Sequence, residues 1–372
     1  MGIYSLENYE KYKTKTIRLN SQSKMPPNFG MNQIHYIKLP WASLEPSRGK
    51  FNLEVIHKEM DNVENKVLVL EPDIPVWVEK QESDYFAAFI RRVGSFIGKD
   101  KKLVGVIIST INNCKAEWDA YIDSFDKTTI FANLENNRLI DYLKSNNKDF
   151  GLLVKCSENN WIDCCERFAK KNLQHLWKKS PVLVHVTDDI CGPNIRREIY
   201  RWHGGLSNKP LDLGYNLTLR RVTYPETVSS KGALPCRFWF ENIGTTRIYQ
   251  PFLIKLQIKP HGLQLLNKRN SYYELTLQCS TELWLIGDIT HNEIIQLPNI
   301  ETGMYSLSIG LFLLDHTPIH LNNENTARNG FCEVGTICID NKERNELFRI
   351  WDTYYPEGYY PLEDPQTPED EE

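Results

Sequence analysis

The predicted fold rests on the stretch Ile34-His-Tyr-Ile-Lys-Leu-Pro-Trp-Ala-Ser-Leu-Glu-Pro-Ser-Arg-Gly49. Its first six residues form an apolar run typical of a buried strand, and residues 53–63 carry apolar side chains at helical spacing. A strand that leads through a short loop into a helix is the repeating unit of a parallel α/β sheet. We therefore expect Trp41 and Glu45 at the carboxyl end of this strand, where (β/α) barrels build their sites.

Strand-like and helix-like segments alternate in the same way over residues 28–210. The strand-like apolar runs are residues 34–39, 67–70, 103–108, 150–154 and 181–186. The amphipathic segments are residues 53–63, 85–97, 134–143 and 161–173. This pattern predicts a TIM-like (β/α) barrel, and because a complete barrel takes about 250 residues, the available length predicts a shortened or incomplete one. Residues 16–19 are a further candidate for a barrel strand.

From residue 211 onward the sequence has the pattern of an all-β domain. The candidate strands are residues 216–222, 236–240, 252–258, 273–278, 283–286, 304–314 and 333–340. Short strands separated by Gly, Pro and Asn turns predict an immunoglobulin-like antiparallel β-sandwich. The expected organisation is an N-terminal extension (1–27), the barrel (28–210), the sandwich (211–345) and an aromatic, then acidic and disordered tail (346–372).

The charge and hydropathy of the chain exclude two classes of partner. The 372 residues carry a formal net charge of −4, so there is no overall positive field to attract nucleic acid. No apolar run approaches the roughly 18 residues of a membrane span, and residues 1–20 are too polar for a signal peptide. We therefore expect no nucleic acid and no membrane as partners and, by default, a cytoplasmic location.

The cysteines and glycines point to no metal or cofactor. The nine cysteines have no Cys-x-x-Cys spacing, which excludes a zinc ribbon and argues against a dense disulfide framework. His316 and His320 have metal-binding spacing, but Pro318 between them disfavours the helix that would aim both at one ion. Neither a glycine-rich phosphate-binding motif nor a nucleophile elbow occurs. We expect no cofactor and no metal.

The loop at residues 41–49 resembles the strand-loop signature of (β/α)-barrel glycoside hydrolases of the β-galactosidase type, in which a Trp precedes Leu-Glu-Pro and a Gly. Over most of its length the chain resembles an uncharacterised family in which such a barrel precedes a β-sandwich of unknown function. The other stretches that carry this resemblance are residues 74–78, 85–94, 103–108, 213–219, 240–244 and 330–339.

The resemblance implies that Glu117 is the general acid/base of a glycosidase. The family has Gly-Glu-Trp after the corresponding strand, and this chain has Ala116-Glu117-Trp118, with Ala in place of Gly. Glycosidic cleavage needs a proton delivered to the leaving oxygen, and a carboxyl group partly desolvated beside an indole suits that task.

A second carboxylate is also required, as nucleophile or as activator of water. Where such barrels usually carry it, at the end of a late strand, this chain has His185. Asp188 or Asp189 is an alternative carboxylate, yet either could equally cap the helix that starts near Gly192. Glu71, at the end of residues 67–70, is a further candidate.

Several other residues are candidates for substrate binding. Trp41 offers an apolar platform for a sugar ring, and Asn113 suits hydroxyl recognition beside Glu117. The alternative is that Trp41 packs the barrel top, that Glu45 shapes a turn, and that His203 is a packing residue. The full set of predicted substrate-binding residues is Trp41, Glu45, Glu71, Trp77, Asn113, Trp118, His185 and His203.

Two functions remain open from the sequence. One is a glycoside hydrolase that acts on an oligo- or polysaccharide, with carbohydrate as the expected partner. The other is a catalytically degenerate protein of the same fold that binds a carbohydrate or a protein without cleaving it. The intact loop at 41–49 and the Glu117-Trp118 pair favour the first, whereas the short barrel and His185 favour the second.

Overall fold

The computed structural model describes residues 14–19, 33–60, 65–98, 100, 103–189, 191–261 and 272–342. The predicted tail 346–372 and most of the predicted N-terminal extension 1–27 lie outside these residues. The described residues within 27–215, together with 245–249, form a compact parallel-sheet unit. Those within 1–26, 216–244 and 250–372 form a second unit, the antiparallel unit.

The parallel-sheet unit is built on seven strands that follow one another in sequence order, and every neighbouring pair is parallel. They are β2 (His35–Pro40), β3 (Lys66–Glu71), β4 (Leu103–Ile107), β5 (Thr129–Asn133), β6 (Gly151–Cys156), β7 (Val182–Val186) and β8 (Gly204–Ser207). A parallel bridge joins Gln33 to Ser207, and the Ile34 N–H donates to the Ser207 carbonyl at 2.8 Å. The sheet therefore curls until residues at its two edges meet.

Apolar side chains fill the inner face of this curled sheet. The described strands and the residue before β2 contribute one layer: Ile34, Val67, Ile107, Phe131, Leu153, Leu183 and Leu206. Because side chains alternate along a strand, residues two positions further on, such as His185 after Leu183, lie on the same inner face nearer the carboxyl end. A ligand bound at the carboxyl end of the sheet, on its inner face, would therefore lie above this apolar layer.

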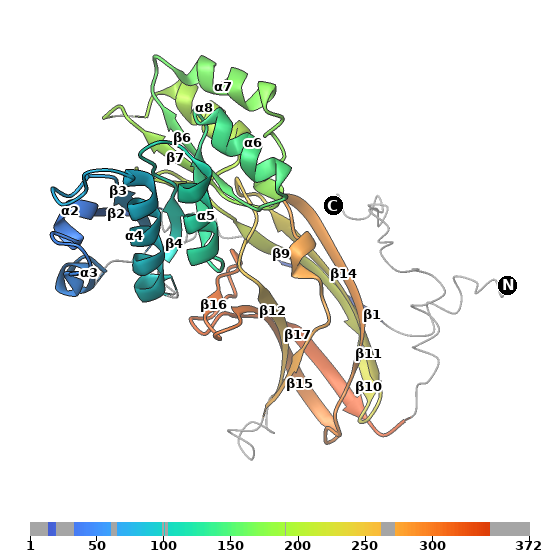
Figure 1. Ribbon diagram of the computed structural model, residues 1–372. Helices are drawn as coiled ribbons and strands as arrows, with labels where there is room; N and C mark the ends of the chain where they lie inside the picture. Colours follow the sequence, from blue (N-terminus) through green and yellow to red (C-terminus); the bar gives the residue numbers. More distant parts are fainter. Residues whose placement is uncertain are drawn as a thin grey trace. The chain divides into compact units, whose positions relative to one another are not determined.

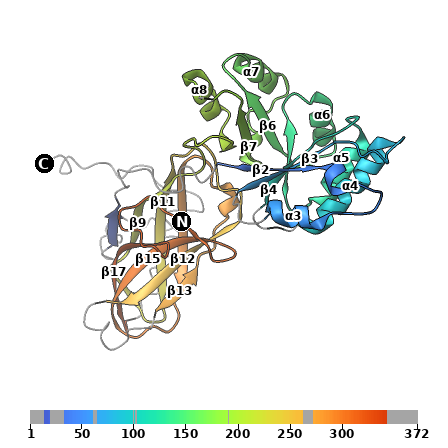
Figure 2. The same cartoon turned by 90° about the vertical axis from the view of Figure 1, so that its left-hand side faces the viewer.

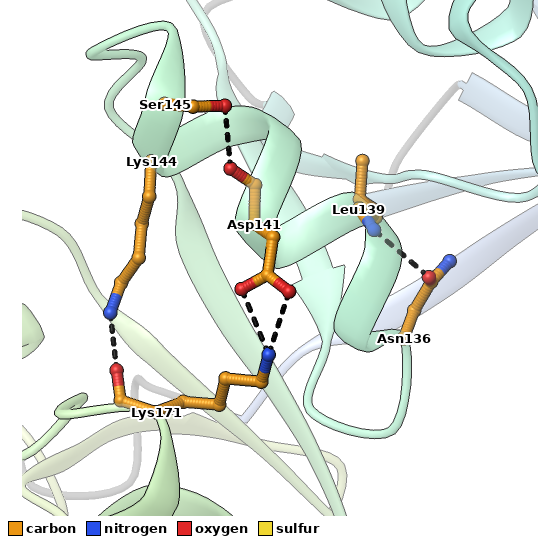
Figure 3. Close-up of polar contacts among 6 residues, drawn as sticks. All are labelled: Asn136, Leu139, Asp141, Lys144, Ser145 and Lys171. Carbon is orange, nitrogen blue, oxygen red and sulfur yellow. Dashed lines mark hydrogen bonds and ion pairs between the residues drawn. The ribbon is translucent and has the colours of Figure 1, made fainter.

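Helices cover the outer face of the sheet, as Figure 2 shows for α4 to α8. Their bounds are α2 (Trp41–Leu44), α3 (Leu53–Met60), α4 (Glu82–Ile97), α5 (Lys115–Ser124), α6 (Asn137–Ser145), α7 (Trp161–Lys170), the 3₁₀ helix η1 (Leu176–Lys178) and α8 (Pro193–Arg201). An ion pair of 2.8 Å between Lys171, just after α7, and Asp141 on α6 joins two of these helices (Figure 3). The predicted parallel α/β sheet is confirmed, with seven described strands.

The antiparallel unit contains two sheets (Figure 1). The first has the order β1 (Thr14–Arg18), β9 (Leu217–Pro225), β11 (Ala233–Asn242), β14 (Gly287–Gln296). The second has the order β10 (Thr227–Ser229), β17 (Phe331–Asp340), β15 (Gly303–Leu313), β12 (Phe252–Pro260), β13 (Tyr273–Thr276), with β16 (Pro318–Ile319) paired to β15. All pairs are antiparallel except β10 with β17.

Two strand predictions were wrong. Residues 16–19 were a candidate barrel strand, but Thr14–Arg18 pairs antiparallel with β9, because this edge of the antiparallel sheet offers it a full ladder. Residues 283–286 were a candidate strand, but residues 281–283 form the 3₁₀ helix η2 (Thr281–Leu283), and the strand begins only at Gly287. The other predicted strands of this half overlap β9, β11, β12, β13, β15 and β17.

Candidate functional site

Glu117 is a buried capping residue of helix α5. It lies at the third position of the helix, and its side chain has 0% exposure. One carboxylate oxygen accepts the backbone N–H groups of Ile111 and Asn112, each at 3.2 Å, and the other accepts the N–H of Cys114 at 3.5 Å. The carboxylate therefore closes the loop after β4 onto the helix, and in this conformation it presents no oxygen to a ligand.

Trp118 and Asn113 belong to the same closed loop. The Trp118 indole N–H donates to the Asn113 side-chain oxygen at 3.2 Å. The amide groups of Asn113 and Asn136 exchange two further hydrogen bonds, at 2.7 and 3.1 Å. Asn136 also accepts the N–H of Leu139 and so caps α6 (Figure 3). Both predicted binding residues are thus bonded to protein groups that hold the loops after β4 and β5 together.

Trp41, Glu45 and Trp77 form a second closed cluster, after β2 and β3. Trp41 is fully buried, and its indole N–H donates to the Glu45 carboxylate at 2.9 Å. The other Glu45 carboxylate oxygen accepts the Gly49 N–H at 2.7 Å, and the Glu45 backbone carbonyl accepts the Trp77 indole N–H at 2.8 Å. This geometry matches the alternative interpretation, in which Trp41 packs and Glu45 shapes the turn that ends at Gly49.

His203 lies at the opposite end of the sheet. It immediately precedes β8, and since all seven strands run in parallel, it sits at their amino ends. Its ring stacks on Trp177 with centroids 4.0 Å apart, and Nδ1 contacts the Thr245 carbonyl at 3.0 Å. Burial lowers the pKa of His203. The structure does not bring this histidine together with the other candidates.

His185 and Tyr36 meet on the inner face of the sheet, above the apolar layer. The Tyr36 hydroxyl lies 3.0 Å from His185 Nδ1, and their ring centroids are 5.4 Å apart. Burial first, and then the charges of Lys155, Lys209 and Lys38, lower the pKa of His185. The imidazole is therefore neutral at pH 7 and pairs with a neutral phenol.

The alternative second carboxylates have structural partners as well. Asp188 accepts the backbone N–H of Glu158 at 2.8 Å. The N-cap residue of α8 is Gly192, and no side chain forms a capping hydrogen bond there. The alternative that Asp188 or Asp189 caps this helix was therefore wrong. Glu71 forms a 3.4 Å ion pair with Lys38 at the carboxyl end of the sheet. Within the seven described strands, Glu71 is the one carboxylate.

The lysines at the carboxyl end were not singled out from the sequence. Lys38 lies two residues after Tyr36 in β2, and Lys155 is the register partner of His185 on the neighbouring strand β6. A lysine at an inner position of an otherwise apolar strand is the signal that could have identified them. In the described part of the chain, no group of three His, Cys, Asp or Glu side chains could hold a metal ion.

Comparisons with known proteins leave the family open. No protein family and no curated protein matches the chain. A metal-bound CARDB domain from Pyrococcus furiosus matches with a TM-score of 0.19 and 14% identity over 34% of this chain and 89% of its own. A mutant β-glucosidase from Listeria innocua with laminaribiose (TM-score 0.21, 9% identity) and the same enzyme with glucose (0.20, 10%) each match 87% of this chain.

The chain spans about half the length of that β-glucosidase, 48%. TM-scores at this level indicate nothing about activity. As for membranes, the helices in the described ranges include none with the length and apolar character needed to cross a bilayer.

Replacing Glu117 tests its capping role directly. Glu117→Ala removes the acceptor of three backbone N–H groups and is expected to lower the free energy of unfolding by about 1–3 kcal/mol. The control is Glu166→Ala, a helical glutamate at the surface whose ion pair with Lys170 should contribute little. Urea unfolding followed by circular dichroism measures both. Equal stability of the two variants would contradict the structural role of Glu117.

Proposed function

We propose that this chain is a carbohydrate-binding protein with a glycoside-hydrolase-like (β/α) barrel, followed in the sequence by a β-sandwich, and with no hydrolytic activity. The observation that carries the proposal is the state of Glu117. Its side chain is fully buried, and both carboxylate oxygens accept backbone N–H groups. A general acid must contact the leaving oxygen, whereas the hydrogen bonds of this carboxyl group go to its own loop.

The contacts of the other candidate carboxylates support the same conclusion. Retaining glycosidases hold two carboxyl groups about 5 Å apart and inverting ones about 6.5–9.5 Å apart, both facing the substrate. Of the candidates, Glu45 is bonded to Trp41 and Gly49, whereas Glu71 is paired with Lys38. Within the seven described strands, Glu71 has no second carboxylate beside it.

The carboxyl end of the curled sheet is the proposed place of binding. Tyr36 and His185 supply hydroxyl and imidazole groups above the apolar layer, and Asn133 at the end of β5 supplies an amide. Groups of this kind hydrogen-bond sugar hydroxyls while the apolar layer contacts the ring. We do not include Trp41 and Trp77, which the sequence predicted as substrate-binding residues, because Trp41 is fully buried and the Trp77 indole N–H is bonded to Glu45.

A paired assay separates binding from hydrolysis. We expect the native chain to bind oligosaccharides in calorimetric titrations while releasing no nitrophenol from aryl glycosides above the uncatalysed rate. Glu117→Gln, checked for folding by circular dichroism, should behave the same in both assays. Turnover by the native chain that disappears in a folded Glu117→Gln variant would overturn the proposal in favour of a hydrolase.

A further inference from the structure

Three lysines surround the Tyr36–His185 pair at the carboxyl end of the parallel sheet. Lys155 is the register partner of His185, so their Cα atoms are neighbours across the β6–β7 ladder. Lys38 follows Tyr36 by two residues on β2 and therefore lies on the same face. Lys209 comes two residues after β8 ends. All three belong to the parallel-sheet unit, and all three act electrostatically on His185.

Among the residues that the structure describes, one of these three lysines, Lys38, forms an ion pair. Lys38 pairs with Glu71 at 3.4 Å, with its side chain still 64% exposed. The Lys209 ammonium donates to the backbone carbonyl of Asp189, at 3.4 Å. Lys155 is exposed, and its ammonium has no ion pair among the residues that the structure describes. The carboxylate of Asp188, in the nearby loop, is used by the Glu158 backbone N–H.

The arrangement favours an anionic ligand on physical grounds. The positive charges of the three ammonium groups repel one another above the apolar layer. An anion bound among them is attracted by all three. Ammonium groups, together with the one donor that the neutral Tyr36–His185 pair leaves free, offer an anion charge-assisted hydrogen bonds, which are stronger than neutral ones. Both carboxylates and phosphates present oxygens suited to such donors.

We infer that the carboxyl end of the parallel sheet binds a sugar that bears an oxyanion, a carboxylate or a phosphate, through Lys38, Lys155, Lys209 and the Tyr36–His185 pair. This inference rests on the proposed function for the sugar, but the anion site stands on the lysines alone. The ligand is bound and not cleaved, so no bond is made or broken.

Calorimetric titration of the full chain with inorganic phosphate at low salt tests the anion site without any sugar. We expect saturable binding that weakens as salt is added, and a loss of about tenfold or more in affinity when Lys155 and Lys209 are both changed to Gln. The matched control is Lys148→Gln, because this exposed lysine precedes the amino end of the same strand β6. Thermal unfolding establishes that each variant is folded.

Sugar ligands then identify the source of the anion. An oligogalacturonate that binds more tightly than glucose 6-phosphate would assign a carboxylate, the reverse order would assign a phosphate, and a neutral cello-oligosaccharide should bind more weakly than either. Phosphate binding that depends on Lys155 and Lys209 without any sugar binding would retain the anion site and overturn the carbohydrate proposal. No phosphate binding, or an equal loss in Lys148→Gln, would overturn the anion site.

Discussion

Phe131→Ala is expected to lower the free energy of unfolding of the parallel-sheet unit by about 3–5 kcal/mol. Phe131 is fully buried on β5 and belongs to the apolar layer of the curled sheet. Its ring fills the space that side chains on both neighbouring strands would otherwise occupy. A Cβ atom added to Gly105 on β4 would lie 2.2 Å from the ring, and one added to Gly151 on β6 would lie 2.5 Å from it.

The two glycines make the prediction sharper, because the same contact can be disturbed from either side. Gly105→Ala should also destabilise the unit, since the new methyl group overlaps the ring edge and the Thr129 carbonyl. Combining Gly105→Ala with Phe131→Leu should cost less than the sum of the single changes, because the smaller side chain leaves room for the methyl group. Urea unfolding followed by tryptophan fluorescence measures all three variants.

Phe96→Ala is the control for that series. Phe96 is 41% exposed on α4, so truncating it should cost much less than truncating Phe131. If the two alanine variants unfold at the same urea concentration, Phe131 does not fill the centre of the sheet.

The long apolar strands of the parallel sheet could be predicted from the sequence, but β5 and β8 could not. Thr129–Asn133 is short and ends in polar residues, and Gly204–Ser207 contains two glycines, which have low strand propensity. Their strand conformation depends on pairing with neighbours, β8 with β7 on one side and Gln33 on the other. Such long-range partners leave no local pattern in a single sequence.

The location of Glu117 could be predicted, but its role could not. The sequence places it shortly after a strand, and the structure agrees. In sequences, a capping box is usually recognised by Ser or Thr three residues before Glu. Here Cys114 occupies the N-cap position, so the capping box could not be recognised from the sequence. A tripeptide that resembles a catalytic motif can thus stabilise a helix start, and only the contacts of the carboxylate distinguish the two roles.

The antiparallel unit should lose stability as the solution becomes alkaline, through His291 on β14. Nε2 of His291 lies 2.8 Å from the Glu293 carboxylate, and both side chains are mostly buried. Burial alone would lower the pKa of His291, but its hydrogen bonds with Cys279 and Glu293 outweigh burial and raise the pKa to about 9. The folded state therefore holds a proton that the unfolded chain releases near pH 6.5.

The sign of the effect follows from these two values. The contribution of His291 is fully present below pH 6.5 and is lost as the pH rises through about 9. At about 1.4 kcal/mol per pKa unit, it amounts to at most about 3 kcal/mol. The difference in unfolding free energy between the native chain and His291→Gln should thus be large at pH 6 and shrink at pH 10. The control is His261→Gln, a change at an exposed position of the same unit, whose effect on the unfolding free energy should not vary with pH in this way. The same pH dependence in both variants would mean that the His291–Glu293 pair does not hold the proton.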